Sequence, residues 1–269
     1  MIVRRSAVAG SFYPASPEQL REELKRCLPD AAVQKQPAIG VVSPHAGYFY
    51  SGAVAGQLYQ QIALPRRVVI LSPNHTGFGQ PVSIMTKGQW ELPLGAALID
   101  EPLAASFLND CPLLKEDELA HRTEHSLEVQ LPFLQYLKKS FRFVPVTLMH
   151  LPFKQCETIG LALARTIRET AEPVLIIASS DLNHYESQKI TDAKDQLAID
   201  AILSLDPARL YETVKKNGIT MCGVIPTTVM LIAARELGAQ QARLIQHATS
   251  GDVTGDYASV VGYASLIVA

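Results

Sequence analysis

The sequence has few cysteines and lacks the short motifs of several common sites. The four cysteines form no CxxC pair and stand apart, at Cys27, Cys111, Cys156 and Cys222. This spacing argues against a disulfide framework and against an iron–sulfur cluster held by closely spaced thiolates. There is also no GxGxxG, no Walker loop and no GxSxG, so nothing indicates nucleotide binding or a serine hydrolase.

The chain also lacks an excess of charge and any long apolar run. Lysine and arginine number 24 against 26 aspartates and glutamates, and no basic run is interleaved with aromatic residues, so no nucleic-acid partner is expected. No apolar stretch approaches the roughly 18 residues of a membrane span. The first residues, MIVRRSAVAGSFYP, have an apolar part too short for an export signal. We therefore expect a cytoplasmic protein with no membrane partner.

What the sequence does have is an alternation of short apolar strands and helical patterns. Strands are predicted at 39–42, 67–71, 141–149 and 174–178, and helices at 16–28, 51–62, 156–170 and 226–237. Continuously apolar strands are typical of a partly parallel sheet that helices cover on both faces. A chain of 269 residues can form one large α/β domain or two small ones. Because no low-complexity linker divides it, we predict one domain, 1–269.

Two histidines follow predicted strands in similar loops. The stretch VVSPHAGYFYS places His45 after Ser-Pro, and SPNHTG places His75 after Ser-Pro-Asn. Proline restricts its own backbone and that of the preceding residue, which holds the following side chain in place. Functional residues of α/β proteins gather at the carboxyl ends of strands, so two such loops would bring both imidazoles to one point. Either histidine alone is equally compatible with a surface loop, whereas the matched pair favours a metal site.

Other residues at similar junctions are candidates, each with a structural alternative. Cys222 precedes a predicted helix, whose N-terminus would lower the thiol pKa and favour the ligating thiolate; the alternative is a buried small hydrophobe. Asp181 and His184 would share a face if a helical turn began there, with the carboxylate orienting the imidazole; the alternative is a helix cap and an exposed histidine. His125 lies in EHSLE, which lacks the second histidine of HExxH, and whether it lines the same pocket stays open.

Seven segments, spread in order over nearly the whole chain, resemble the Memo family, also called AmmeMemoRadiSam system protein B. Any one of them alone is a weak signal, whereas seven in order are specific. The segments are AVAGSFYP at 7–14, SPHAGYFYSG at 43–52, SPNHTG at 72–77, EHSLEVQLPFL at 124–134, SSDLNHY at 179–185, CGVIP at 222–226 and the terminal DYASVVGYAS.

The resemblance implies a single α/β/α sandwich with a mixed, partly parallel central sheet, similar to class III extradiol dioxygenases. Those enzymes bind Fe(II) through two histidines and a glutamate. By the family pattern, the ligands of one mononuclear metal would be His45, His75 and Cys222, with the cysteine replacing the glutamate. His184 would transfer protons, with Asp181 beside it. Fe(II) is expected ahead of copper or zinc, although thiolate is a soft ligand that also suits Cu(I) and zinc.

These implications leave three hypotheses. The first is a metal-dependent oxidoreductase of unknown substrate. The second is a non-enzymatic protein that holds a metal, a small molecule or a peptide, and the third is a metal-free protein with a vestigial pocket. The family name also implies pathway neighbours of the radical-SAM and AMMECR types.

Overall fold

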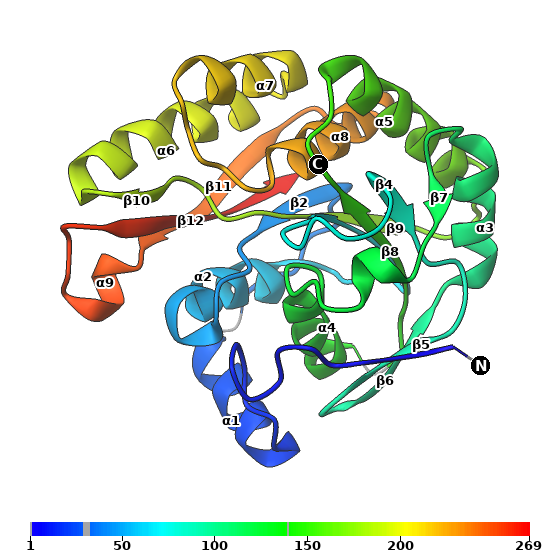
Figure 1. The fold of residues 1–269 in the computed structure, drawn as a ribbon, viewed down its shortest axis with the longest axis horizontal. Helices are drawn as coiled ribbons and strands as arrows, with labels where there is room; N and C mark the ends of the chain where they lie inside the picture. Colours follow the sequence, from blue (N-terminus) through cyan, green and yellow to red (C-terminus); the bar gives the residue numbers. More distant parts are fainter. Residues whose placement is uncertain (1, 29–32, 139) are drawn as a thin grey trace.

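The computed structural model describes residues 2–28, 33–138 and 140–269 and is built around a mixed twelve-stranded sheet (Figure 1). Four neighbouring parallel strands form its centre, and almost every residue in them is buried, as expected for strands covered on both faces. In order across the sheet they are β8 (Arg142–Leu148), β3 (Arg67–Pro73), β9 (Val174–Ser179) and β2 (Gly40–Ser43).

The outer strands make the sheet mixed. Next to β2 lies the antiparallel β12 (Val260–Val268), which pairs with both β11 (Ala242–Thr249) and β10 (His184–Glu186). Beyond β8 lie β6 (Gly95–Ile99), β5 (Gln89–Leu92) and β1 (Val3–Arg5), while β4 (Val82–Ile84) pairs with β8 and with β7 (Lys115–Glu116). Short strands such as β1 and β10 were not predicted from the sequence pattern.

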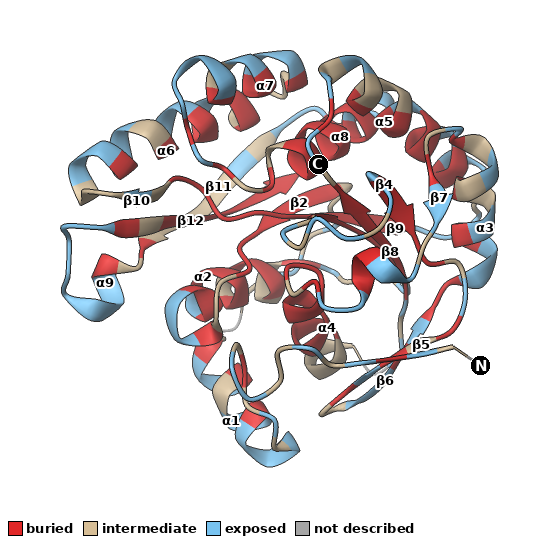
Figure 2. Ribbon diagram, viewed as in Figure 1, coloured by how far each residue is buried: buried red, intermediate tan, exposed pale blue. Residues whose placement is uncertain are grey.

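Helices cover the sheet on both faces. One group consists of α1 (Pro17–Cys27), α2 (Tyr48–Gln61) and α4 (Leu131–Leu137). The other group consists of α3 (Glu101–Asp110), α5 (Phe153–Arg168), α6 (Gln188–Leu203), α7 (Pro207–Lys216) and α8 (Val224–Glu236), and a short helix, α9 (Gly251–Thr254), precedes β12. Figure 2 shows the buried residues concentrated on the sheet and on the helix faces that meet it. The predicted α/β sandwich with a mixed central sheet is confirmed.

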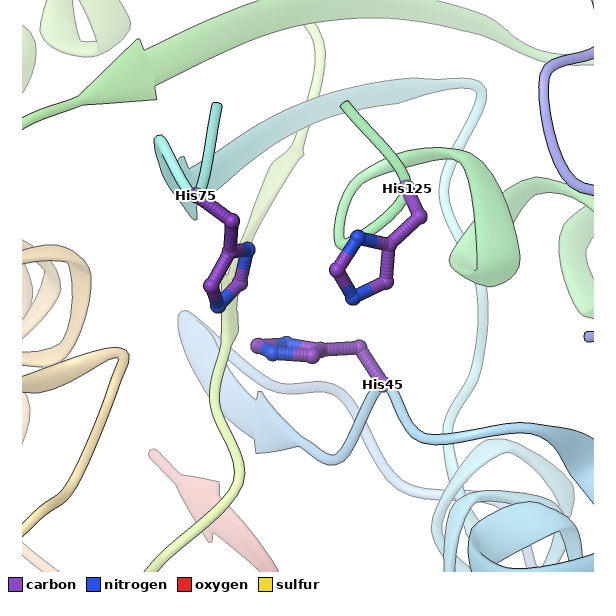
Figure 3. Close-up of side chains that lie close together, drawn as sticks. All are labelled: His45, His75 and His125. Carbon is purple, nitrogen blue, oxygen red and sulfur yellow. The ribbon is translucent and has the colours of Figure 1, made fainter. Parts of the chain in front are cut away.

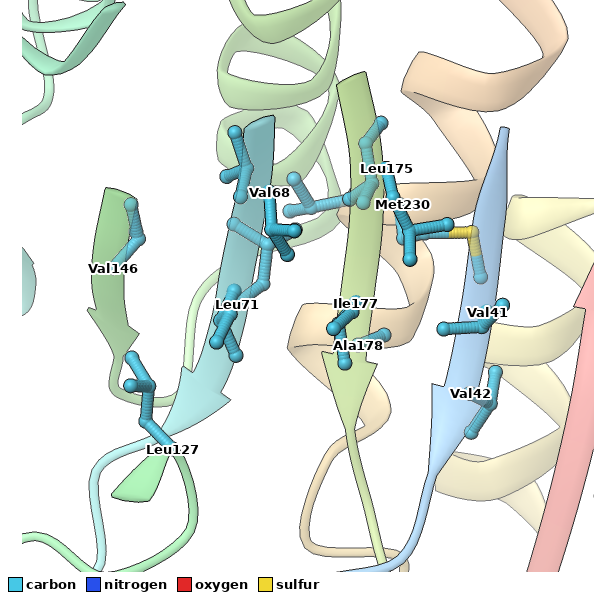
Figure 4. Packing of buried hydrophobic residues seen from close by; sticks show 14 of the residues in the cluster. Val41, Val42, Val68, Leu71, Leu127, Val146, Leu175, Ile177, Ala178 and Met230 are labelled. Carbon is cyan, nitrogen blue, oxygen red and sulfur yellow. The ribbon is translucent and has the colours of Figure 1, made fainter. Parts of the chain in front are cut away.

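Helix α8 packs closely on the central strands and forms the core on this face of the sheet. Its residues from Ile225 to Ala234 are all buried, and none of them is charged. Figure 4 shows Met230 of α8 lying over Val41 and Leu175. At Gly40 a Cβ atom would collide with the side chain of Met230, so a larger residue there would force that side chain to move.

Local sequence signals predicted several boundaries well. Ser16 caps α1, and its Oγ accepts a hydrogen bond from the Gln19 backbone N–H at 3.4 Å. Pro132 lies in the first turn of α4, the position where proline is favoured because its missing N–H has no partner there in any case. Helix α2 begins at Tyr48, earlier than the predicted 51. Among the described residues no helix is both long and apolar enough to cross a membrane.

The order of the central strands determines which loops meet. Strand β9 lies between β3 and β2 and is parallel to both. The loops that follow these three strands therefore leave the same edge of the sheet side by side. They carry His75, His45 and the segment from Asp181 to His184, which places all the strand-end candidates at one edge.

Candidate metal centre

Three imidazoles from three separate loops converge at this edge. His45 follows β2, His75 follows β3, and His125 lies in the irregular segment before α4 (Figure 3). Their candidate ligand nitrogens all lie within 4.8 Å of one another. Two nitrogens bound to one metal at about 2.1 Å lie roughly 3–4 Å apart, so small side-chain shifts would bring all three onto one ion.

Glu124 orients His75. The Nδ1–H of His75 donates to Glu124 Oε1 at 2.9 Å, and the backbone N–H of His75 donates to Oε2 at 2.6 Å. Burial acts to raise the pKa of Glu124, but the hydrogen bonds and charge of His75 and the hydrogen bonds of Ser126 outweigh it and lower that pKa to about 2. The carboxylate is therefore ionised and fixes the proton of His75 on Nδ1, leaving the Nε2 lone pair for a metal.

A hydroxyl group fixes His45 in the same way. Ser179 Oγ donates its only hydrogen to the carbonyl of Ser126 at 2.6 Å, so at 2.9 Å it must accept from Nδ1–H of His45. Gln130 Nε2 donates to the same oxygen at 2.9 Å. The Nε2 atom of His45 therefore also carries its lone pair. Burial, with the neighbouring His75 adding to it, lowers the pKa of His45, which keeps this imidazole neutral.

Cys222 reaches this cluster through His45. Its Sγ lies 3.2 Å from His45 Nε2, close to the separation of a sulfur and a nitrogen that share one metal. Sγ also accepts from the Asp181 backbone N–H at 3.3 Å. The expectation of a lowered thiol pKa is wrong for the metal-free site: burial first, and the charge of Asp181 second, raise the pKa of Cys222 despite its place before α8. Metal binding would release the thiol proton.

Asp181 and His184 line the same cavity as the three histidines, but they do not form a helical turn. Residues 181–183 are irregular and His184 begins β10, so the expectation that they share one face of a helix is wrong. The Oδ1 atom of Asp181 accepts from the His45 backbone N–H at 2.7 Å. His184 Nδ1–H donates to the Thr220 carbonyl at 3.0 Å, which leaves its Nε2 as an acceptor in the cavity.

His125 is the residue whose position the sequence left open. The structure places its Nδ1 3.4 Å from Glu124 Oε1, so one carboxylate faces two imidazoles. Its ring stacks on that of His75 with centroids 4.7 Å apart. The signal in the sequence was Glu124-His125 itself, an acid next to a histidine, which by spacing alone matched no known metal motif.

The N-terminal segment closes one side of the site. Phe12 packs against His125 with ring centroids 4.7 Å apart. Buried Glu128 holds this segment in place: its Oε1 accepts from Tyr13 Oη at 2.5 Å and its Oε2 accepts from the Ala7 backbone N–H at 2.8 Å. Arg4 forms an ion pair with Glu128. The cavity beside the histidines has a volume of about 650 Å³.

Replacing Glu124 with glutamine should weaken metal binding about 10–100-fold, the usual effect of losing a partner that orients a metal-ligating histidine. Glutamine brings an N–H donor to a site where His75 already presents two donors. Competition with a chromophoric chelator measures the affinity. The matched exposed variant Glu118→Gln should bind like the parent, and equal affinities for both variants would exclude the orienting role of Glu124.

Buried His121 should make the protein less stable as the pH falls. Burial, with the charge of Arg4 adding to it, lowers its pKa to about 3. The unfolded chain binds this proton below about pH 6.5 and the folded chain does not, so stability is lost between about pH 6.5 and 3. In His121→Gln the slope of unfolding free energy against pH should be shallower by up to about 1.4 kcal/mol per pH unit. Denaturant unfolding at a series of pH values measures it, and an unchanged slope would contradict the assignment.

The fold and the site thus define an α/β sandwich protein with a cluster of histidines that could hold a metal ion at the carboxyl edge of its sheet. The family model described as Memo-like protein matches residues 4–267. The chain is 43% identical to a MEMO1 family protein of Methanopyrus kandleri, over 98% of each chain. It is 44% identical to a MEMO1 family protein of Thermotoga neapolitana, over 99% of this chain and all of the other. The chain belongs to the Memo family.

A solved structure shows the same fold at much lower sequence similarity. The crystal structure of an uncharacterized protein from Escherichia coli K12 matches with a TM-score of 0.57 and 14% identity, over 85% of this chain and 98% of the other. At this identity the match concerns the fold alone.

Proposed function

We propose that this chain is a mononuclear metal-dependent oxidoreductase whose metal is held by His45, His75 and Cys222. The observation that supports it best is the pair of fixed tautomers: Glu124 and Ser179 hold protons on the Nδ1 atoms, so two Nε2 lone pairs face the cluster. The thiol 3.2 Å from one of them completes a mixed nitrogen and sulfur donor set. We favour iron(II) at this site over copper and zinc, although thiolate is a soft ligand that also suits Cu(I) and zinc.

The remaining residues would serve substrate and proton transfer. When bound, iron(II) would supply positions for a substrate and for O₂. His184 faces the cavity with an acceptor nitrogen and would take a proton from a bound substrate. Asp181 holds the backbone of His45 through its hydrogen bond and would keep that loop in place. His125 would be a further polar contact beside the metal.

Oxygen uptake by iron-loaded protein tests this function. Protein purified and loaded without oxygen is mixed with catechols and other diols, and O₂ consumption is recorded. The proposal predicts uptake with at least one defined substrate and a loss of roughly 10²–10⁴-fold in His184→Ala with the metal content unchanged. Uptake that is equal in the parent and the variant would contradict the role of His184.

The soft thiol of Cys222 favours a second candidate, a non-enzymatic protein that holds copper or a ligand beside radical-SAM and AMMECR-type proteins in the cytoplasm. That candidate predicts tight, stoichiometric copper binding and no oxygen uptake with any diol. Rapid turnover of a defined substrate would exclude it.

A further inference from the structure

The cavity beside the histidines has no fixed positive charge. Among the described residues that line it, none is lysine or arginine. A phosphate or carboxylate group on a ligand would therefore find no lysine or arginine among the lining side chains to pair with.

A carboxylate at the rim of the cavity favours a positively charged ligand instead. Asp256 lines the cavity and is exposed. Its Oδ1 accepts from the Ala258 backbone N–H at 2.9 Å, and in the described part of the chain it forms no ion pair. One oxygen of this carboxylate is thus available to a ligand that donates a hydrogen bond.

Three tyrosines line the same cavity, namely Tyr50, Tyr185 and Tyr263. They come from α2, β10 and β12, so three separate elements bring phenol rings to one opening. Burial raises the pKa of Tyr263, and Asp181, Tyr50 and Tyr185 raise it further, as expected if these groups lie close together. Faces of aromatic rings attract cations, and several rings around one opening are a known way to hold an ammonium group.

The backbone of Tyr185 is unusual. It has a φ of 62°, in the left-handed region that side chains other than glycine, asparagine and aspartate seldom adopt, and its side chain is largely exposed. Such strain persists where the surrounding structure imposes it, and it clusters at binding sites. Here the hydrogen bonds of His184 to Thr220 hold the preceding residue, and Tyr185 stays at the cavity.

We propose that the cavity takes a cationic, amine-bearing small molecule, with its ammonium group held at the rim by Asp256, Tyr50 and Tyr185. The opposite end of the molecule faces His45, His75 and His184 at the floor. This inference rests on the proposed function in one respect only, that the floor is the metal-binding end. It names the charge of the ligand at the rim and excludes molecules that carry a phosphate or carboxylate at that end as preferred ligands.

Three probes that share one phenol ring and differ in end charge test the proposal. They are tyramine, tyrosol and 3-(4-hydroxyphenyl)propionate, which end in an ammonium, a hydroxyl and a carboxylate group. Isothermal titration of both metal-loaded and metal-free protein gives the affinities. We expect tyramine to bind at least about ten-fold more tightly than the acid, with tyrosol between them. Equal affinities, a preference for the acid, or no binding of tyramine would overturn the proposal.

Paired variants locate the charge. Asp256→Asn should weaken the binding of tyramine several-fold and leave the binding of tyrosol unchanged. The control Glu212→Gln, on α7 and outside the cavity lining, should change neither affinity. Tyr50→Leu should weaken tyramine, and Tyr50→Phe, which keeps the ring face, should not. If the Asp256→Asn protein binds all three probes as tightly as the parent does, Asp256 does not hold the ammonium group.

The metal content of the same samples separates this inference from the proposed function. If the protein takes up no metal but still prefers tyramine, the failure to take up metal contradicts the metal site and the preference supports the cation site. Normal metal content without any charge preference would support the metal site and contradict the cation site.

Discussion

Alanine in place of His75 should remove at least about nine-tenths of the metal from protein purified without oxygen. His75 is the ligand candidate whose geometry is most fully determined, because Glu124 bonds to both its backbone N–H and its Nδ1–H. Loss of an orienting partner alone costs 10–100-fold in affinity, and loss of the ligand itself should cost at least as much. Elemental analysis of the purified variant and parent measures the effect.

Controls distinguish ligand loss from general damage. His150→Ala removes an exposed histidine outside the cluster and should retain the metal content of the parent. Thermal unfolding of both variants in chelator compares their stabilities without metal. A His75→Ala protein that folds normally and keeps its metal would show that the assignment of this ligand is wrong.

Replacing Glu128 with glutamine should cause the largest loss of stability. Glu128 is fully buried and accepts hydrogen bonds from Tyr13, Ala7 and Val8 in addition to its ion pair with Arg4. Glutamine keeps the shape but leaves the guanidinium buried without its counter-charge. Removing one partner of a buried ion pair costs about 3–5 kcal/mol, which for a chain of this size lowers Tm by roughly 6–20 °C.

The matched control is Glu91→Gln. Glu91 pairs with Arg5 at 3.9 Å on the surface, where both side chains are at least half exposed, so its loss should cost less than about 1 kcal/mol. Thermal and denaturant unfolding of both variants, measured without metal, gives the comparison. If Glu128→Gln lost no more stability than Glu91→Gln, the buried network would not be what holds the N-terminal segment on the fold.

Much of the fold followed from local patterns, whereas the order of the strands did not. Apolar runs such as RVVIL predict β3, and Ser16-Pro17 predicts the start of α1. The insertion of β9 between β3 and β2 depends on contacts between residues more than 100 positions apart, such as Val69 with Ile176. No local signal specifies such a pairing. That one arrangement brings the His45 and His75 loops together.

The candidate site was likewise predictable only in part. His45 and His75 were recognisable because each follows a strand and a proline. The groups that set their tautomers, Glu124 and Ser179, were not, because Ser179 ends a strand far along the chain and its role depends on where its hydroxyl proton goes. The thiol pKa of Cys222 was misjudged for a related reason: burial is a property of the whole fold, and it outweighs the local effect of the helix N-terminus.

The central claim is that His45, His75 and Cys222 hold one metal ion. X-ray absorption spectroscopy of the iron-loaded protein, kept free of oxygen, tests it most directly. We expect one sulfur scatterer at about 2.3 Å together with imidazole nitrogens at about 2.0–2.2 Å. The sulfur signal should be absent from Cys222→Ser at the same iron content. A first shell of nitrogen and oxygen alone in the parent protein, with a third imidazole in place of the sulfur, would contradict the claim.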